Sequence, residues 1–245
     1  MILNAIIIFL FALVPVSTDY RSILPRTSNF CEIKCGWKKH ICCIYGYDFG
    51  PKCYTRPILQ HIGEMEKEAI VDIINSIRNE VASGNASRGD LRRLTASNMH
   101  SVSYSRKLEY TASCWAKQCI PHHSRCRSIE DGRLGETICV SHGFTRRITN
   151  FSENLFLQCP RNMMKQFPEF SMSIIDQLAL PTFGDDEKHR ESVQLIWART
   201  RFIGCSRVVY PHNRRGFSNV LIVCHFFPSG NVLEAPIFLL LEAPR

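Results

Sequence analysis

The twelve cysteines are the residues of this 245-residue chain that say most about its chemistry. A reducing cytosol does not favour so many thiols, whereas an exported protein uses them as crosslinks. Metal binding is the alternative, but neither the vicinal pair Cys42-Cys43 nor the spacing Cys114-x4-Cys119 forms the paired Cys-x-x-Cys pattern of a structural zinc site. We therefore predict disulfides and a secreted, extracellular protein.

Patterns for hydrolytic catalysis are missing from the sequence. It contains no Gly-x-Ser-x-Gly nucleophile motif and no His-Glu-x-x-His zinc motif. Four histidines, His122, His142, His212 and His225, have no partner at ligand spacing. We expect each of them to be a surface or hydrogen-bonded residue, and we predict a protein that is not an enzyme.

Apolar periodicity locates the elements that would position a site. From Glu64 to Gly84, apolar residues recur every three or four positions between charges, which predicts an amphipathic helix. Further helices are predicted around 108–119, around 163–175 and at 185–197, followed by strands at 202–210 and 219–227 and a last extended segment at 235–241. Helices first and strands late favour an α+β layered domain.

The chain begins with an apolar run at residues 2–16, followed by Ser17 and Thr18. This is typical of a secretory signal peptide cleaved near Thr18, with an N-terminal membrane anchor as the alternative. No other stretch is apolar enough to span a bilayer, so no transmembrane segment is expected in the mature chain. Export would make Asn85 and Asn150, each in an Asn-x-Ser sequon, glycosylation sites.

The formal charge of +8 is spread along the chain, and its densest basic groups are short pairs without interleaved aromatic residues. Nucleic acid is therefore not an expected partner. A basic secreted protein could still be attracted to anionic lipid headgroups or sulfated glycans.

Several short motifs follow one another along the chain, each weak alone and specific in this order. They are Cys31-x3-Cys35, Phe49-Gly-Pro-x-Cys53, Arg78-Asn-Glu-Val-Ala-Ser-Gly84, Ala96-Ser-Asn-Met99, Trp115-Ala-x-Gln-Cys119, Cys119-x3-His123-x2-Cys126, Gly135-Glu136, Gln194-x2-Trp197-Ala-x-Thr200-x3-Gly204-Cys205 and Cys224-x3-Pro228-Ser-Gly-Asn231. Over nearly the whole mature chain, the pattern resembles the CAP superfamily (cysteine-rich secretory, antigen 5, pathogenesis-related 1). Within that superfamily it resembles the insect antigen 5 (venom-allergen-like) group.

The resemblance implies a CAP domain at 63–245, preceded by a signal peptide at 1–18 and a cysteine-rich extension at 19–62. The implied fold is an α-β-α sandwich with a three-stranded antiparallel sheet between helical layers. The implied disulfides are Cys31–Cys43, Cys35–Cys126, Cys53–Cys119 and Cys205–Cys224. The pairing of Cys42, Cys114, Cys139 and Cys159 stays open, and the vicinal Cys42 and Cys43 could exchange roles.

Members of the family gather two histidines and two glutamates in a cleft that can hold a divalent cation. Carried over by motif, the first histidine falls on His123 and the glutamates on Glu136 and, in a weakly matching stretch, Glu169. The position of the second histidine is Glu191 here. One histidine with up to three carboxylates would favour calcium or magnesium over zinc, so a divalent cation is the candidate cofactor. The alternative is a degenerate cleft of solvated or salt-bridged side chains, and Ile74, in place of a family histidine, is expected to fill the core.

The leading functional prediction is a secreted, monomeric, non-enzymatic binding module. Its partner would be an extracellular protein or a sterol or lipid, in venom, saliva, defence or reproductive fluid, as the resemblance implies. One alternative is a cation-dependent hydrolase that uses His123 and Glu136. Another is a crosslinked extracellular structural component.

Overall fold

The computed structural model describes residues 29–46, 48–54, 56–86, 94–145, 149–165, 187–212 and 216–241. Helices and strands alternate along the first part of the chain, and two long strands follow the last helix. In order the elements are α1 (Ile41–Tyr45), the 3₁₀ turn η2 (Pro51–Cys53), β1 (Ile58–Gln60), α2 (Glu64–Ala82), β2 (Ser103–Tyr104), α3 (Arg106–Ala116), β3 (Gly135–Thr145), α4 (Thr149–Lys165), α6 (Glu187–Leu195), β4 (Phe202–Pro211) and β5 (Phe217–Phe227).

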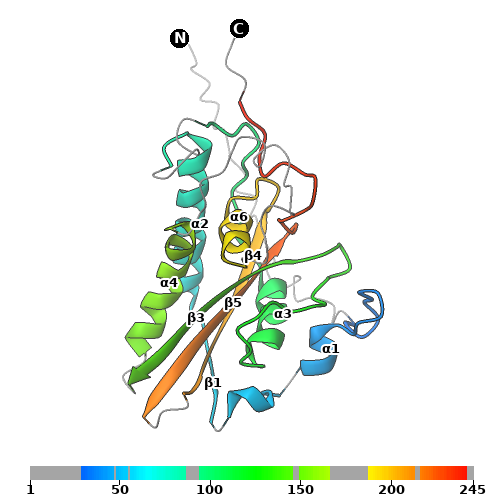
Figure 1. Cartoon of the computed structure of the whole chain (residues 1–245), viewed down its shortest axis with the longest axis vertical. Coiled ribbons are helices and arrows are strands. Elements are labelled where there is room, and N and C mark those ends of the chain that lie inside the picture. Colours follow the sequence, from blue (N-terminus) through cyan, green and yellow to red (C-terminus); the bar gives the residue numbers. More distant parts are fainter. Residues whose placement is uncertain are drawn as a thin grey trace, which may run out of the picture.

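Three long antiparallel strands, β3, β5 and β4, run diagonally through the molecule (Figure 1). The short strand β1 pairs antiparallel with β4, and β2 pairs with β4 in parallel. The two short strands thus extend the expected three-stranded sheet at β4 into a five-stranded one, and the α+β class is confirmed. Strands of two and three residues are too short to leave a readable alternation in the sequence.

The sheet separates two hydrophobic cores because successive side chains of a strand point to opposite faces. In β5, Ile222 and Cys224 belong to one core, whereas Leu221 and Val223 belong to the other. Residues of α2, α4 and α6 complete the first core, and residues of α1 and α3 complete the second. Figure 1 shows α2 and α4 together on one side of the strands and α3 with α1 on the other. The expected α-β-α sandwich is confirmed.

Helix α2 begins at Glu64, as its periodicity predicts, and Gly84 lies just beyond its end with a φ of 72°. The helix predicted around 163–175 is displaced, because α4 spans Thr149–Lys165 and residues 166–175 lie outside the described part of the chain. Pro160 lies inside α4, and a proline in a helix interior counts against predicting a helix there.

Gly204 of β4 allows α3 to lie directly on the sheet. A Cβ atom at this position would overlap the backbone of the helix, at Glu109 N and Ser105 O. Because backbone atoms cannot move aside cheaply, only glycine fits here, and the close approach places Thr111 of α3 over the neighbouring strand β5.

All four predicted disulfides are present in the structure. The cysteines left open form two more pairs, Cys42–Cys114 and Cys139–Cys159, so all twelve are oxidised. Three bonds, Cys35–Cys126, Cys42–Cys114 and Cys53–Cys119, join the N-terminal cysteine-rich segment to α3 and the residues that follow it. This segment is therefore crosslinked to the domain rather than separate from it.

Several expectations concern residues at the margins of the described structure. The predicted signal peptide and Glu169 lie outside it. Asn85 is exposed, and Asn150 lies at the start of α4. Within the described ranges, no helix combines the length and apolar character needed to cross a membrane.

Candidate functional site

A cluster of histidine and glutamate side chains lies on the face of the sheet that α3 covers. Glu136 of β3 and His225 of β5 are directly opposite each other in the strand register, so their side chains point to the same face. His123 comes from the loop after α3, and Glu191 comes from α6. Four separate segments of the chain therefore bring these four side chains together.

Glu136 is the centre of the cluster, and its side chain is fully buried. One carboxylate oxygen accepts hydrogen bonds from Ser124 N at 2.7 Å and His123 Nδ1 at 3.0 Å. The other oxygen accepts from Ser124 Oγ at 2.7 Å and His225 Nε2 at 3.0 Å. Arg127 Nη1 adds an ion pair at 3.5 Å. Protein donors thus occupy both oxygens of this carboxylate.

His123 bridges the two carboxylates of the cluster. Its Nδ1 faces Glu136, and its Nε2 lies 3.3 Å from Glu191 Oε1. Glu191 also accepts a hydrogen bond from Ile138 N, at 3.0 Å to Oε2, which fixes its carboxylate against β3. The sequence-based assignment of His123, Glu136 and Glu191 to one cluster therefore agrees with the geometry.

The charges in the cluster follow from these contacts. Burial alone would lower the pKa of His123, but hydrogen bonds to Glu136 and Glu191 outweigh burial and raise it to about 9. Burial would raise the pKa of Glu136, yet the hydrogen bonds from His123 and His225 hold it well below its usual range. Burial raises the pKa of Glu191 in spite of His123. At neutral pH, a protonated His123 therefore lies between the two glutamates.

His225 is a hydrogen-bonded histidine, which is one of the two outcomes expected from the sequence, but its partner Glu136 was not foreseen. It is fully buried, and burial lowers its pKa despite the adjacent carboxylate of Glu136. The neutral tautomer that satisfies both neighbours donates Nε2–H to Glu136 and accepts at Nδ1 from Thr111 Oγ1, 2.8 Å away. The contact between His225 and Glu136 follows from the pairing register of β3 with β5. It could not be predicted, because the sequence pattern did not reveal β3.

A cation in the cluster would have to displace contacts that the protein itself makes. Carboxylates face both nitrogens of His123, and both oxygens of Glu136 already accept two hydrogen bonds each. Among the residues that the structure describes, no three His, Cys, Asp or Glu side chains form a group that could hold a metal ion. Ile74 is 1% exposed and fills the core, as predicted for this departure from the family pattern.

The ion pairs of His123 should make the free energy of unfolding depend on pH. The pKa of His123 is raised from 6.5 to about 9, so its contribution is complete below pH 6.5 and is lost as the pH rises through 9. We expect the free energy of unfolding of wild type relative to His123→Gln to fall by on the order of 3 kcal/mol between pH 6 and pH 10. Urea unfolding of both proteins with intact disulfides measures this difference. A difference that does not change with pH would contradict the charged state of His123.

Comparison with known proteins identifies the family of the chain. Residues 71–226 match the model of the CAP (Cysteine-rich secretory protein) family. The chain belongs to this family. Venom allergen 5.02 of Dolichovespula maculata is 28% identical to this CAP protein, and the match covers 87% of the present chain and 95% of the relative. Venom allergen 5 2 of Polybia paulista is 30% identical over 86% and 98%. The expected membership in the antigen 5 group is confirmed.

Solved structures share the fold of this CAP protein. BmVAL-1 superposes with a TM-score of 0.60 at 20% identity, covering 74% of this chain and 85% of that one. NaASP2, solved with Zn²⁺, has a TM-score of 0.56 at 23% identity, covering 74% and 88%. At these identities the likeness extends to the fold.

Proposed function

We propose that this CAP protein is an exported, non-enzymatic binding module. Its His/Glu cluster (His123, Glu136, Glu191 and His225) is a structural lock, by which we mean a closed set of ion pairs and hydrogen bonds that stabilises the fold and does no catalysis. The observation that carries the proposal is the saturation of the cluster: four protein donors hold Glu136, and carboxylates face both nitrogens of His123. A general base needs a free lone pair within reach of a substrate proton, and neither Glu136 nor His123 offers one in this arrangement.

Export is supported by the six disulfides and by the venom allergens among the relatives. An exported monomer with this rigid crosslinked scaffold would present its surface to an extracellular protein or an apolar ligand such as a sterol or lipid. Venom, saliva, defence secretions and reproductive fluid are the corresponding settings. Because all twelve cysteines are paired within the chain, the alternative of a crosslinked structural component has no free thiol to use.

A hydrolysis assay tests the non-enzymatic part of the proposal. The purified, secreted protein is incubated with peptide and ester substrates, with and without added Zn²⁺, Ca²⁺ or Mg²⁺. We expect rates equal to the buffer blank and to His123→Gln in every condition. A metal-dependent rate that disappears in His123→Gln would overturn the proposal in favour of the cation-dependent hydrolase.

A further inference from the structure

An open pocket lies at the end of the sheet where β4 turns into β5, which is the lower end in Figure 1. Its volume is about 430 Å³, within the ~300–1,000 Å³ range of small-molecule sites. We call it the hairpin pocket. Its walls include Lys52, Tyr54, His142, Tyr210 and Asn219. The His/Glu cluster lies towards the other end of β3 and β5, and none of its four residues lines the hairpin pocket.

Tyr54 is held at the hairpin pocket in a backbone conformation that residues other than glycine rarely adopt. Its φ is 57° and its ψ is −140°. The preceding residue, Cys53, is buried and crosslinked to Cys119, which also has a positive φ, 56°. Residues held in such conformations cluster at ligand sites, where the surrounding structure maintains them at a cost. The Tyr54 side chain is 61% exposed, so its ring is available as a flat platform for a ligand.

The imidazole of His142 is fixed by a buried amide. Asn219 is 6% exposed, and its Nδ2 donates to Pro211 O at 3.3 Å while its Oδ1 lies 3.0 Å from His142 Nδ1. Because an amide oxygen only accepts, Nδ1 carries a proton, and Nε2 of the neutral ring is the acceptor left for a ligand. Burial raises the pKa of the Tyr210 hydroxyl, which therefore stays protonated and can donate. The pocket thus offers both an acceptor and a donor.

The charge at the hairpin pocket is positive. Lys52 is exposed, and in the part of the chain that the structure describes it forms no ion pair with a carboxylate. Among the described residues, no acidic side chain lines the pocket. One ammonium group beside an aromatic platform and hydrogen-bonding groups suits a ring-shaped, hydroxylated ligand with one anionic substituent. A free inorganic anion would use Lys52 alone and leave the Tyr54 ring without a contact.

We propose that the hairpin pocket binds one anionic sugar residue, with its sulfate or carboxylate at Lys52 and its ring against Tyr54. The sugar hydroxyls donate to His142 Nε2 and accept from the Tyr210 hydroxyl. Sulfated and uronic sugars are components of extracellular glycans. The inference therefore rests on the proposed function in requiring export, and it adds a ligand class to the binding module.

The experiment is an NMR titration of the isotope-labelled, full-length secreted protein with three sugars matched except at one position. They are galactose, galacturonate, and galactose sulfated on its primary hydroxyl. We expect each anionic sugar to bind at least about threefold more tightly than galactose, which is the scale of one exposed charged contact. The two anions separate a carboxylate preference from a sulfate preference. Adenosine monophosphate, which also combines a ring with an anion, is titrated in parallel.

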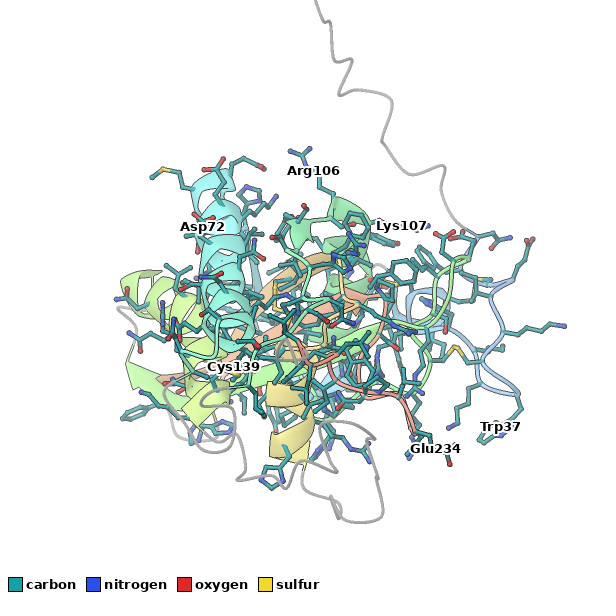
Figure 2. All side chains as sticks on the ribbon, turned by 90° about the horizontal axis from the view of Figure 1, so that it is seen from above. Trp37, Asp72, Arg106, Lys107, Cys139 and Glu234 are labelled. Carbon is teal, nitrogen blue, oxygen red and sulfur yellow. A yellow bond between two sulfur atoms is a disulfide. The ribbon has the colours of Figure 1, made fainter. Side chains whose placement is uncertain are left out.

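Two pocket variants and one matched control localise the binding. Tyr54→Gly should weaken all three sugars about tenfold, because it removes the platform. Its midpoint of urea unfolding should equal or exceed that of wild type, because glycine adopts a positive φ freely, so a folding defect cannot explain the loss. Lys52→Gln should reduce the affinity for the anionic sugars to that for galactose and leave galactose unchanged. Trp37→Ala removes an 87% exposed ring outside the pocket, at the periphery in Figure 2, and should change nothing.

The outcomes separate the site from the proposed function. Sugar binding that Tyr54→Gly and Trp37→Ala leave equally unchanged would overturn the hairpin pocket as the site. Equal affinities for galactose and both anionic sugars would overturn the anionic ligand class. Tighter binding of adenosine monophosphate than of every sugar would overturn the inference in favour of a nucleotide, and binding of none would also overturn it. The proposed function fails in a different experiment, namely if metal-dependent hydrolysis is found.

Discussion

Arg78→Met is expected to lower the free energy of unfolding by at least about 4 kcal/mol, an exceptional effect for one substitution. Arg78 lies in α2, is 2% exposed and has no acidic partner among its hydrogen bonds. Burial lowers the pKa of its guanidinium to about 10, so the group remains charged at neutral pH.

The five N–H bonds of the Arg78 guanidinium donate to five backbone carbonyls. Its Nε reaches His100 O at 2.7 Å, and the terminal nitrogens reach four carbonyls, one at the last residue of α6 and three in the segment after it, at 2.8 to 3.3 Å. Methionine keeps the length of the side chain but leaves these acceptors without donors, each at a cost of about 1–3 kcal/mol where water cannot replace the bond. The arginine thus holds α2 to the chain segment that leads into β4.

Denaturant unfolding with intact disulfides measures the effect. Arg106→Met is the matched control, because the Arg106 side chain is 72% exposed and pairs with Glu64 at the surface, where an ion pair contributes less than about 1 kcal/mol. If both variants lost similar small amounts of stability, the carbonyls around Arg78 would have to be hydrated, and this account of the buried arginine would be wrong.

Glu136→Gln is expected to cost about 3–5 kcal/mol, because it removes one partner from a buried charge network. The amide nitrogen must replace one carboxylate oxygen, and N–H donors face both: Ser124 N and His123 Nδ1 at one, His225 Nε2 at the other. The substitution also takes the negative charge away from His123. We therefore expect the pKa of His123 to fall below about 9, with only Glu191 left to raise it.

Unfolding experiments give the loss of stability, and proton NMR of the imidazole gives the change in pKa. Glu130→Gln makes the same chemical change at a surface position, where the carboxylate lies 2.7 Å from Lys107 Nζ and is 50% exposed. It should cost less than about 1 kcal/mol and leave the pKa of His123 unchanged. An unchanged His123 pKa in Glu136→Gln would contradict the lock.

The sequence predicted the fold correctly where an ordered set of motifs or a residue spacing has only one structural interpretation. The ordered motifs predicted four disulfides correctly, and the spacing of Ile70, Ile74 and Ile77 predicted α2. Strand β3 was missed because both faces are buried at its start and the polar residues Glu136 and Thr137 are among the buried ones, so apolar residues do not alternate with polar ones. Without β3, the pairing of Cys139 with Cys159 of α4 could not be deduced either.

The site was only partly readable for a related reason. Motif matching placed His123, Glu136 and Glu191 in one cleft, and the structure brings them within hydrogen-bonding or ion-pair distance. It did not show that donors saturate Glu136, because Ser124 and His225 contribute through loop conformation and strand register. The family resemblance implied a metal-binding set, whereas the protonation and mutual contacts of these residues determine what the cluster can do.

A His/Glu cluster that is closed by its own ion pairs should hold no resident cation. Metal content of the secreted protein, purified without chelator, tests it most directly when thermal melting is also recorded with and without EDTA. We predict far less than one divalent cation per chain and the same melting temperature in both conditions. About one bound cation per chain, with a lower melting temperature after chelation, would contradict the lock and make His123 and Glu191 metal ligands.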